Sequence, residues 1–220
     1  MNLKKSLFVA LLILFIQSTN AQHNYDSYNR LGLMAGVSIY DLNTSDLNTS
    51  SGTGFMMGFS ARGSFYNQFD LIYGIKFLSN KIKIQGHLAT NTLDVQNIDY
   101  TIQTVQVNFL GSYNIVRHHL SIEAGPMLNI NGKMKVDSER LEDYILDGHT
   151  TLKAKEIQDI SKVNFHVVTG LTAGLENFRL IAQYQFGITN TLNKLNDKNL
   201  EKNNFDGKSS TVLLAVVVYF

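Results

Sequence analysis

The chain ends on an apolar, β-branched run, Ser209–Phe220, which restricts the possible folds more than any other segment. The run is too short for a transmembrane helix, which needs about 20 apolar residues, but it matches the roughly 9–11 residues of a tilted transmembrane strand. Strand side chains alternate between two faces, so Val216, Val218 and Phe220 share one face. We interpret this run as the closing strand of a membrane β-barrel, with those three residues pointing outward.

The N-terminus has the pattern of a secretory signal peptide. Lys4 and Lys5 precede the apolar run Leu7–Ile16, and small residues follow at Thr19 and Ala21. This pattern predicts a signal peptide at residues 1–21, cleaved after Ala21, and a barrel domain at residues 22–220. The alternative, a single membrane anchor, would need an apolar run about twice as long. The chain has no cysteine, which excludes a lipid-modified cysteine, a disulfide framework and thiol chemistry.

Apolar and polar residues alternate with period two in eight segments between residues 31 and 220, as expected for strands with one apolar and one polar face. The connections between them are alternately long and short. Short periplasmic turns and longer extracellular loops are typical of outer-membrane barrels. The predicted strands are Leu31–Tyr40, Thr53–Phe65, Phe69–Ser79, Tyr100–Ile115, Leu120–Ile130, Lys162–Leu175, Arg179–Asn190 and Ser209–Phe220.

Aromatic residues support the membrane interpretation over a secreted β-sandwich. Five of them are predicted to point outward at the short-turn ends of strands, where a barrel carries an aromatic girdle. In a sandwich such rings would belong in a core between two sheets. The sequence therefore predicts an all-β fold, an eight-stranded antiparallel up-and-down transmembrane β-barrel in the cell outer membrane. The girdle residues are Phe65, Phe69, Tyr113, Phe178 and Phe220.

Three segments resemble the strand motifs of the PorT-like outer-membrane β-barrel family: Ser121–Met127, Phe165–Glu176 and Tyr184–Asn190. The resemblance covers nearly all of the chain after the signal peptide and rests on the order and spacing of these motifs. It implies a small eight-stranded barrel preceded by a signal peptide. The family's founding member is implicated in protein secretion and gliding, and this role is not carried over to the present chain.

Six charged residues are predicted to point into the barrel, three of each sign. An eight-stranded barrel is just wide enough for side chains to fill it, and a buried charge is costly unless paired. We therefore expect the interior to be a closed plug, with Arg62 and Asp70 diagonal across one hairpin and Glu176 near Arg179 across another. A narrow conduit for a small hydrophobic solute is the alternative. The six residues are Arg62, Asp70, Lys76, Glu123, Glu176 and Arg179.

Histidines raise the possibility of an outer-leaflet lipid-modifying enzyme. His166 points inward, His118 and His119 lie on a periplasmic turn, and His87 and His149 lie in extracellular loops. No serine or acidic partner can be assigned to them from spacing, and no histidine or carboxylate pair has metal-binding spacing on a predicted strand. We expect no catalytic residue, no cofactor and no metal, with a lipid-modifying enzyme as the alternative.

The expected role is structural or surface-binding, through the long extracellular loops. Loops on a rigid scaffold are common binding sites, and the longest, residues 131–161, is the expected site for a protein partner. The other expected partners are outer-membrane lipid and the barrel assembly machinery, because a C-terminal strand that ends in Phe resembles the signal read during assembly. The net charge of +1 and a pI near 7.9 show no basic excess, which argues against nucleic acid.

Overall fold

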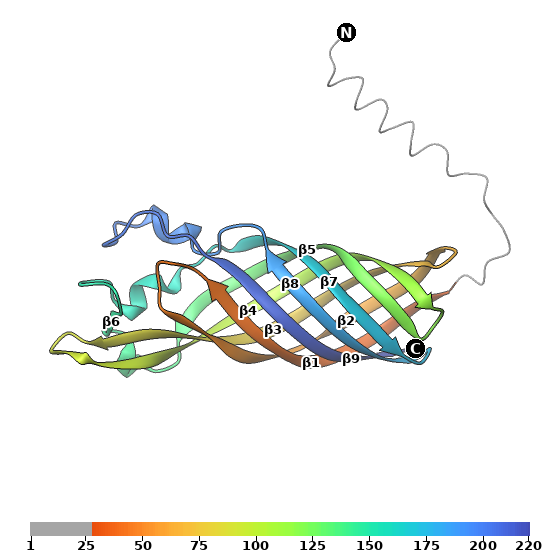
Figure 1. Cartoon of the computed structure of the whole chain (residues 1–220), viewed down its shortest axis with the longest axis horizontal. Helices are drawn as coiled ribbons and strands as arrows, with labels where there is room; N and C mark the ends of the chain where they lie inside the picture. Colours follow the sequence, from red (N-terminus) through yellow and green to blue (C-terminus); the bar gives the residue numbers. More distant parts are fainter. Residues whose placement is uncertain (1–27) are drawn as a thin grey trace, which may run out of the picture.

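The computed structural model describes residues 28–220, so the predicted signal peptide and residues 22–27 lie outside the described part of the chain. Eight long strands form the wall of a barrel, and Figure 1 shows them tilted relative to its long axis. They are β1 (Asn29–Asn43), β2 (Thr49–Tyr66), β3 (Phe69–Leu88), β4 (Asn91–Val116), β5 (Leu120–Val136), β7 (Val163–Gly174), β8 (Phe178–Gly187) and β9 (Lys208–Tyr219).

Each wall strand pairs antiparallel with its neighbours in the chain, and β1 pairs with β9 to close the ring. The closing ladder runs from Gly32 opposite Tyr219 to Asn43 opposite Lys208. The eight-stranded antiparallel up-and-down barrel predicted from the sequence is therefore confirmed.

The short turns lie at one end of the barrel together with the C-terminus, and the long loops lie at the other (Figure 1). The predicted girdle residues point outward at the short-turn end, and the Phe69 and Tyr113 rings lie 5.2 Å apart. In outer-membrane barrels the short turns are periplasmic and the long loops extracellular. The exposed fractions are Phe65 69%, Phe69 48%, Tyr113 43%, Phe178 46% and Phe220 70%.

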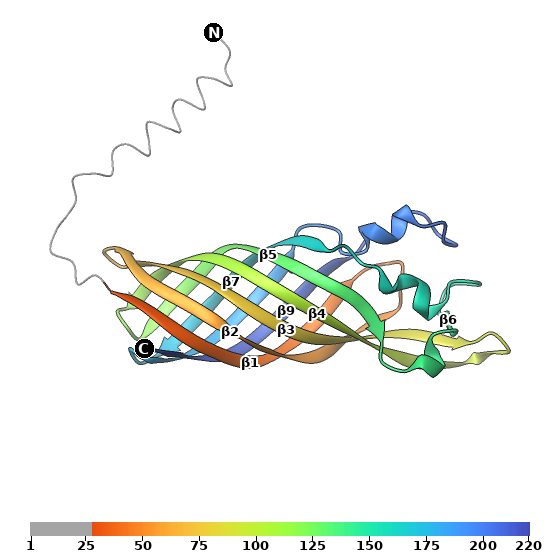
Figure 2. The same cartoon turned by 180° about the vertical axis from the view of Figure 1, so that it is seen from behind.

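Three predicted links are wrong in their bounds, because most of residues 41–52, most of residues 80–99 and the start of residues 131–161 are strand. β3 continues to Leu88 and β4 begins at Asn91, so the two form a hairpin that projects beyond the rest of the wall (Figure 2). β5 continues to Val136.

The alternation changes its chemistry where these strands leave the membrane. Within the membrane band the outward residues are apolar, such as Ile75 and Phe77. Beyond it the outward residues are Lys81 and Lys83, while Ile82 is fully buried. Within the membrane the outer face of a strand meets lipid and its inner face is polar. Beyond the membrane the outer face meets water and the inner face packs into an apolar core. A search for strands with apolar outward faces therefore misses the extension.

The loops contain short elements only. Loop 3 (residues 137–162) carries the 3-10 helices η1 (Glu139–Leu141) and η2 (Ala154–Gln158) and the two-residue strand β6 (Ile145–Leu146). Loop 4 (residues 188–207) carries the 3-10 helix η3 (Asn193–Asp197). Within residues 28–220, no helix has the length and apolar character needed to cross a membrane.

Candidate functional site: the barrel interior and the extracellular cap

Arg62 is the centre of a buried ionic network near the periplasmic end. Its Nε donates to Asp70 Oδ2 at 2.8 Å and its Nη1 donates to Glu123 Oε1 at 3.2 Å. All three side chains are 2% exposed. Nη2 also donates to Ser112, Asn114 and Ser121 at 2.8–3.0 Å. Paired charges with additional hydrogen bonds can be accommodated away from water, so this network fills the lower barrel.

Two further buried cations have no carboxylate partner among the described residues. Lys76 Nζ donates to Gln183 Oε1 at 3.0 Å, and Arg179 Nη2 is 3.5 Å from Ser121 Oγ. Both side chains are 2% exposed. The interior of the described chain thus holds three cations and two carboxylates rather than the balanced set expected from the sequence.

The prediction for Glu176 is wrong. Its side chain is 55% exposed and pairs with Arg30, whose Nη1 also donates to the Glu176 carbonyl oxygen at 2.8 Å. Arg179 points inward, so these two residues do not form the predicted pair. The reason is local: β7 ends at Gly174, which has a φ of +149°, and strand alternation does not extend into the turn that contains Glu176.

Tyr28 covers the periplasmic mouth and was not identified from the sequence. Its hydroxyl donates to Asp70 Oδ2 at 2.6 Å, and its backbone N–H donates to Ser64 Oγ at 3.0 Å. Burial, followed by the hydrogen bond to Asp70, raises the pKa of Tyr28 to about 12. The phenol therefore stays neutral and acts as a donor that joins the residue before β1 to the Arg62 network.

The extracellular mouth is closed by an apolar core. Loop 3 leaves β5 and crosses to β3, where Leu146 in β6 pairs with Gly86. It brings apolar side chains against the inward faces of the extended strands, and Tyr100 donates its hydroxyl to the Ala154 carbonyl at 3.1 Å. The fully buried members include Ile82, Ile84, Ile98, Tyr100, Met134, Leu146, Ala154, Ile157, Leu192 and Leu195.

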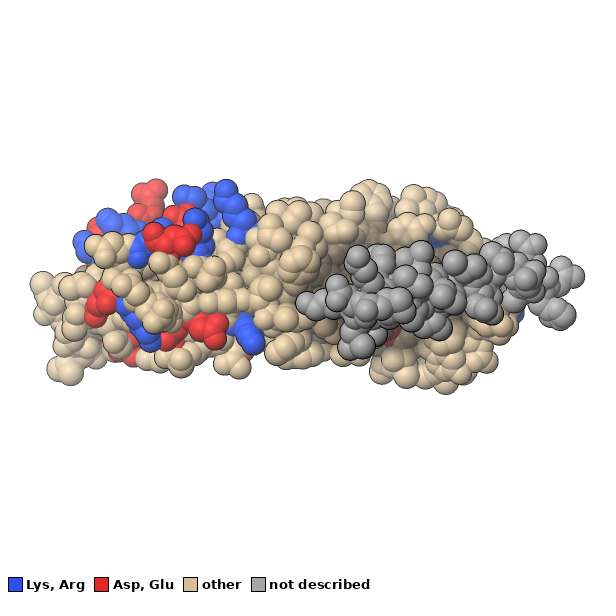
Figure 3. Space-filling view, turned by 90° about the horizontal axis from the view of Figure 1, so that it is seen from above, with Lys and Arg blue, Asp and Glu red and all other residues tan. Residues whose placement is uncertain are grey.

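Three loops form an ordered cap above this core. Loop 1 (residues 44–48) is joined to loop 4 by an ion pair between Asp46 and Lys202 and by the Asp206 N–H, which donates to Asp46 at 2.7 Å. The cap encloses a polar cleft of about 330 Å³. In Figure 3 the charged side chains gather at the loop end, and the visible barrel wall carries few. The cleft is lined by Ser45, Asp46, Asn48, Asp147, Gly148, His149, Glu201 and Lys202.

Glu201 joins loop 4 to loop 3. Its carboxylate accepts the backbone N–H groups of Thr150, Thr151 and Leu152 at 2.6–3.0 Å. The hydrogen bonds from the Thr150 and Thr151 N–H groups lower the pKa of Glu201 to about 2. The carboxylate is thus ionised at neutral pH and fixes one loop against the other.

His166 and Ser209 are the nearest approach to a catalytic pair in the described chain. His166 Nε2 lies 2.9 Å from Ser209 Oγ, but His166 Nδ1 has no hydrogen-bond partner within residues 28–220. A serine nucleophile needs its histidine oriented by a third group and a space for substrate. Both residues are at most 4% exposed, so this arrangement supplies neither.

The other histidines within residues 28–220 make structural contacts. His149 Nε2 lies 2.9 Å from the Asp46 carbonyl oxygen, His119 Nδ1 lies 2.9 Å from the Gly174 carbonyl oxygen, and His87 Nδ1 lies 3.1 Å from the Leu88 carbonyl oxygen. The His118 ring lies 5.5 Å from that of Tyr28. Within residues 28–220, no three His, Asp or Glu side chains have a metal-binding arrangement.

The C-terminal residues named from the sequence lie on the outer surface. Val218 is 49% exposed and Phe220 is 70% exposed, with Val216 half-buried on the same face. The Phe220 N–H donates to the Leu31 carbonyl at 2.9 Å, which ties the end of the chain to β1.

The comparisons with known proteins agree with this architecture. Neisserial surface protein A shares 14% identity with the chain at a TM-score of 0.52, covering 86% of this chain and 97% of that protein. Ail of Yersinia pestis, in complex with the heparin analogue sucrose octasulfate, gives 14% identity, a TM-score of 0.46 and coverages of 87% and 99%. OprG of Pseudomonas aeruginosa gives 10% identity and a TM-score of 0.44, covering 88% of this chain and 95% of that protein. No curated protein sequence matches the chain.

At 14% identity, the similarity to Neisserial surface protein A shows the fold alone. The family model described as "Outer membrane protein beta-barrel domain" matches residues 16–193, which is most of the chain. The polar interior, the outward apolar band and the girdle are the features that such a barrel needs in a bilayer. The chain therefore belongs to the outer membrane protein beta-barrel domain family and is an integral outer-membrane β-barrel protein.

Proposed function

We propose that the protein is a closed, non-enzymatic barrel whose extracellular cap binds a partner at the cell surface, and that it belongs to the PorT-like branch of its family. In this proposal the signal peptide is removed after Ala21 during export. Val216, Val218 and Phe220 then act as the signal recognised by the barrel assembly machinery.

The observation that carries this proposal is the blockage of the barrel at both ends. Tyr28 and the Arg62 network fill the periplasmic end, and the apolar core under loop 3 fills the extracellular end. A conduit for a polar or hydrophobic solute would have to pass both. The plugs therefore support a role on the outside of the barrel rather than transport through it.

The cap has the properties of a binding surface. It is ordered by contacts between loops 1, 3 and 4, and it presents charged side chains and a polar cleft to the extracellular side. A pre-ordered surface binds with a smaller entropic cost than a loop that must fold on binding. We propose a protein partner that contacts loop 3, and nothing in the sequence favours nucleic acid.

Site-specific photo-crosslinking in living cells tests this proposal. A photoreactive residue replaces Glu139 in loop 3 or, as the control, Leu180 on the lipid-facing wall. We expect a discrete protein adduct from position 139, absent at position 180, that weakens in Glu201→Gln because the loops are no longer tied together. If both photoreactive variants reach the cell surface in equal amounts and position 139 gives no discrete adduct, the cap-binding role is contradicted.

A further inference from the structure

A surface track on the lipid-facing wall has an apolar lower part and a charged upper part. It runs along β7, β8, β9 and β1, below loops 1 and 4. Three depressions form it, of about 460, 380 and 450 Å³ from the extracellular side downward. The upper two share Tyr184 in their lining, and the lower two share Leu171 and Ala182. The three depressions are therefore adjacent along the wall.

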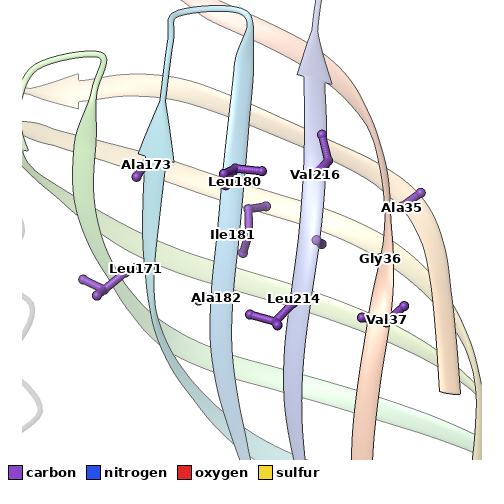
Figure 4. Close-up of a pocket in the computed structure, with 11 residues that line it drawn as sticks. Ala35, Gly36, Val37, Leu171, Ala173, Leu180, Ile181, Ala182, Leu214 and Val216 are labelled. Atoms are coloured by element: carbon purple, nitrogen blue, oxygen red, sulfur yellow. The ribbon is translucent and has the colours of Figure 1, made fainter. Parts of the chain in front are cut away.

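Small outward residues create the lower part of the track. Ala182 lies between Leu171 on β7 and Leu214 on β9, and Ala35 and Ala173 both lie on the outward row next to it, with Leu180 and Val216. These residues lie on β7, β8, β9 and β1, and Figure 4 shows leucine side chains at the sides of the hollow. Leu171, Leu180 and Leu214 are 50–55% exposed. An apolar chain that lies over Ala182 would contact leucine side chains on both sides.

The upper part of the track is polar and carries both signs of charge. Asp41, Asp206 and Lys208 line it, above the outward rings of Tyr184 and Phe186. Within residues 28–220 none of the three charged side chains takes part in a side-chain hydrogen bond or an ion pair. Other charged side chains of the cap, such as Asp46 and Lys202, are paired. Two free carboxylates and a free ammonium fit a headgroup that itself carries an ammonium and a phosphate.

The dimensions agree with one leaflet of a bilayer. From Ser210 in the polar part to Val216 at the lower end of the track is six residues, or about 20 Å along a strand. A strand tilted by about 40° covers about 15 Å of membrane depth over this length. This is half of a hydrocarbon core about 30 Å thick.

We propose that this track holds one zwitterionic lipid with a primary ammonium and a phosphate in its headgroup. The ammonium lies between Asp41 and Asp206, the phosphate contacts Lys208, and an acyl chain lies over Ala182. The site is separate from the cap cleft and from the barrel interior, so it can be tested independently of the role proposed for the cap.

Native mass spectrometry of the purified full-length barrel tests the proposal. The protein is released from detergent micelles that contain phosphatidylethanolamine, phosphatidylcholine or phosphatidylglycerol of equal chain length. We expect saturation at one retained phosphatidylethanolamine, with retention about tenfold above that of phosphatidylcholine. Retention of many lipids without saturation, or equal retention of all three, would overturn the proposal.

Two variants separate the acyl groove from the headgroup cleft. Ala182→Phe fills the groove and should reduce retention of every lipid about tenfold, whereas the matched control Ala61→Phe, on the lipid-facing side of β2, should not. Asp41→Asn with Asp206→Asn should remove the preference for the ethanolamine headgroup and leave residual binding. Equal effects of Ala182→Phe and Ala61→Phe would contradict the track. If Ala182→Phe does not fold, Ala35→Leu takes its place, because it fills the same hollow with a smaller side chain.

Discussion

His166 and Ser209 meet at 2.9 Å across a glycine, because His166 pairs with Gly187 on β8 and Gly187 lies next to Ser209 on β9. A Cβ at position 187 would lie 2.7 Å from the Ser209 carbonyl oxygen and 3.1 Å from His166 Nε2. The contact therefore depends on the absence of a side chain at the residue between them.

Gly187→Ala should destabilise the barrel, because the added methyl group meets backbone that cannot move away. Overpacking of this kind costs about 1–3 kcal/mol. The free energy of unfolding, measured by urea titration of the protein in lipid vesicles, tests this. Gly111→Ala is the matched control, since its Cβ would meet only the Ala124 carbonyl oxygen, at 3.8 Å. Equal losses in the two variants would show that the His166–Ser209 contact is not tight.

Arg62→Met should be far more destabilising than removal of a surface arginine. It leaves Asp70 and Glu123 without their cation, and breaking a buried ion pair costs about 3–5 kcal/mol. Arg30→Gln removes a solvent-exposed pair with Glu176 and should cost at most about 1 kcal/mol. The same urea titration compares them. If the two variants unfold at the same urea concentration, the Arg62 network does not hold the lower barrel together.

Tyr28→Phe should weaken the periplasmic end without unfolding the barrel. The phenol donates to the Asp70 side chain, which is paired with Arg62, and a hydrogen bond to a charged group contributes about 1.5–3 kcal/mol. Asp70 keeps its contacts with Arg62 and Asn114, so the loss in the free energy of unfolding should lie near the lower end of this range. Hydrogen exchange of the β2–β3 turn should rise in this variant and stay unchanged at the loop end. Faster exchange at the loop end would contradict a local role for Tyr28.

Glu201→Gln should release loop 4 from loop 3 while the barrel stays folded. The folded-state pKa of Glu201, about 2, lies below its ordinary value of 4.5. The contact therefore stabilises the cap fully above about pH 4.5, and this stabilisation is lost as the pH falls towards 2. Trypsin cleavage at Lys198 and Lys202 should be faster in the variant at neutral pH. Asp197→Asn, which removes only an exposed pair with Lys194, serves as the control. Equal cleavage of Glu201→Gln and wild type would contradict this role for Glu201.

The sequence predicts the wall because the bilayer imposes one rule on every strand within it. Residues such as Phe77 and Val212 point to lipid, and their neighbours point inward. Beyond the membrane the rule reverses, which is why the alternation predicts a link rather than strands at the isoleucines 82, 84 and 98. A pattern with lysine outside and isoleucine inside, immediately after a membrane strand, is the signal that would have found the extension.

The contacts that define the candidate sites depend on register, which alternation alone does not give. Arg62, Asp70, Lys76, Glu123 and Arg179 lie in the barrel interior, but the identity of their partners follows from the alignment of strands around the ring. Glu176 was misplaced because a glycine at positive φ ends the strand before it. Tyr28 could not be found, since nothing local in the sequence shows that the residue before a strand folds across the barrel mouth.

The most direct test of a closed barrel is single-channel conductance in a planar bilayer. Wild type is compared with a variant in which residues 138–160 are replaced by a short Gly-Ser linker, and heat-modifiable gel mobility confirms that both are folded. We predict no conductance steps from wild type. The variant should also show none, because Tyr28 and the Arg62 network still fill the periplasmic end. Stable conductance steps from the wild-type protein would contradict the closed barrel.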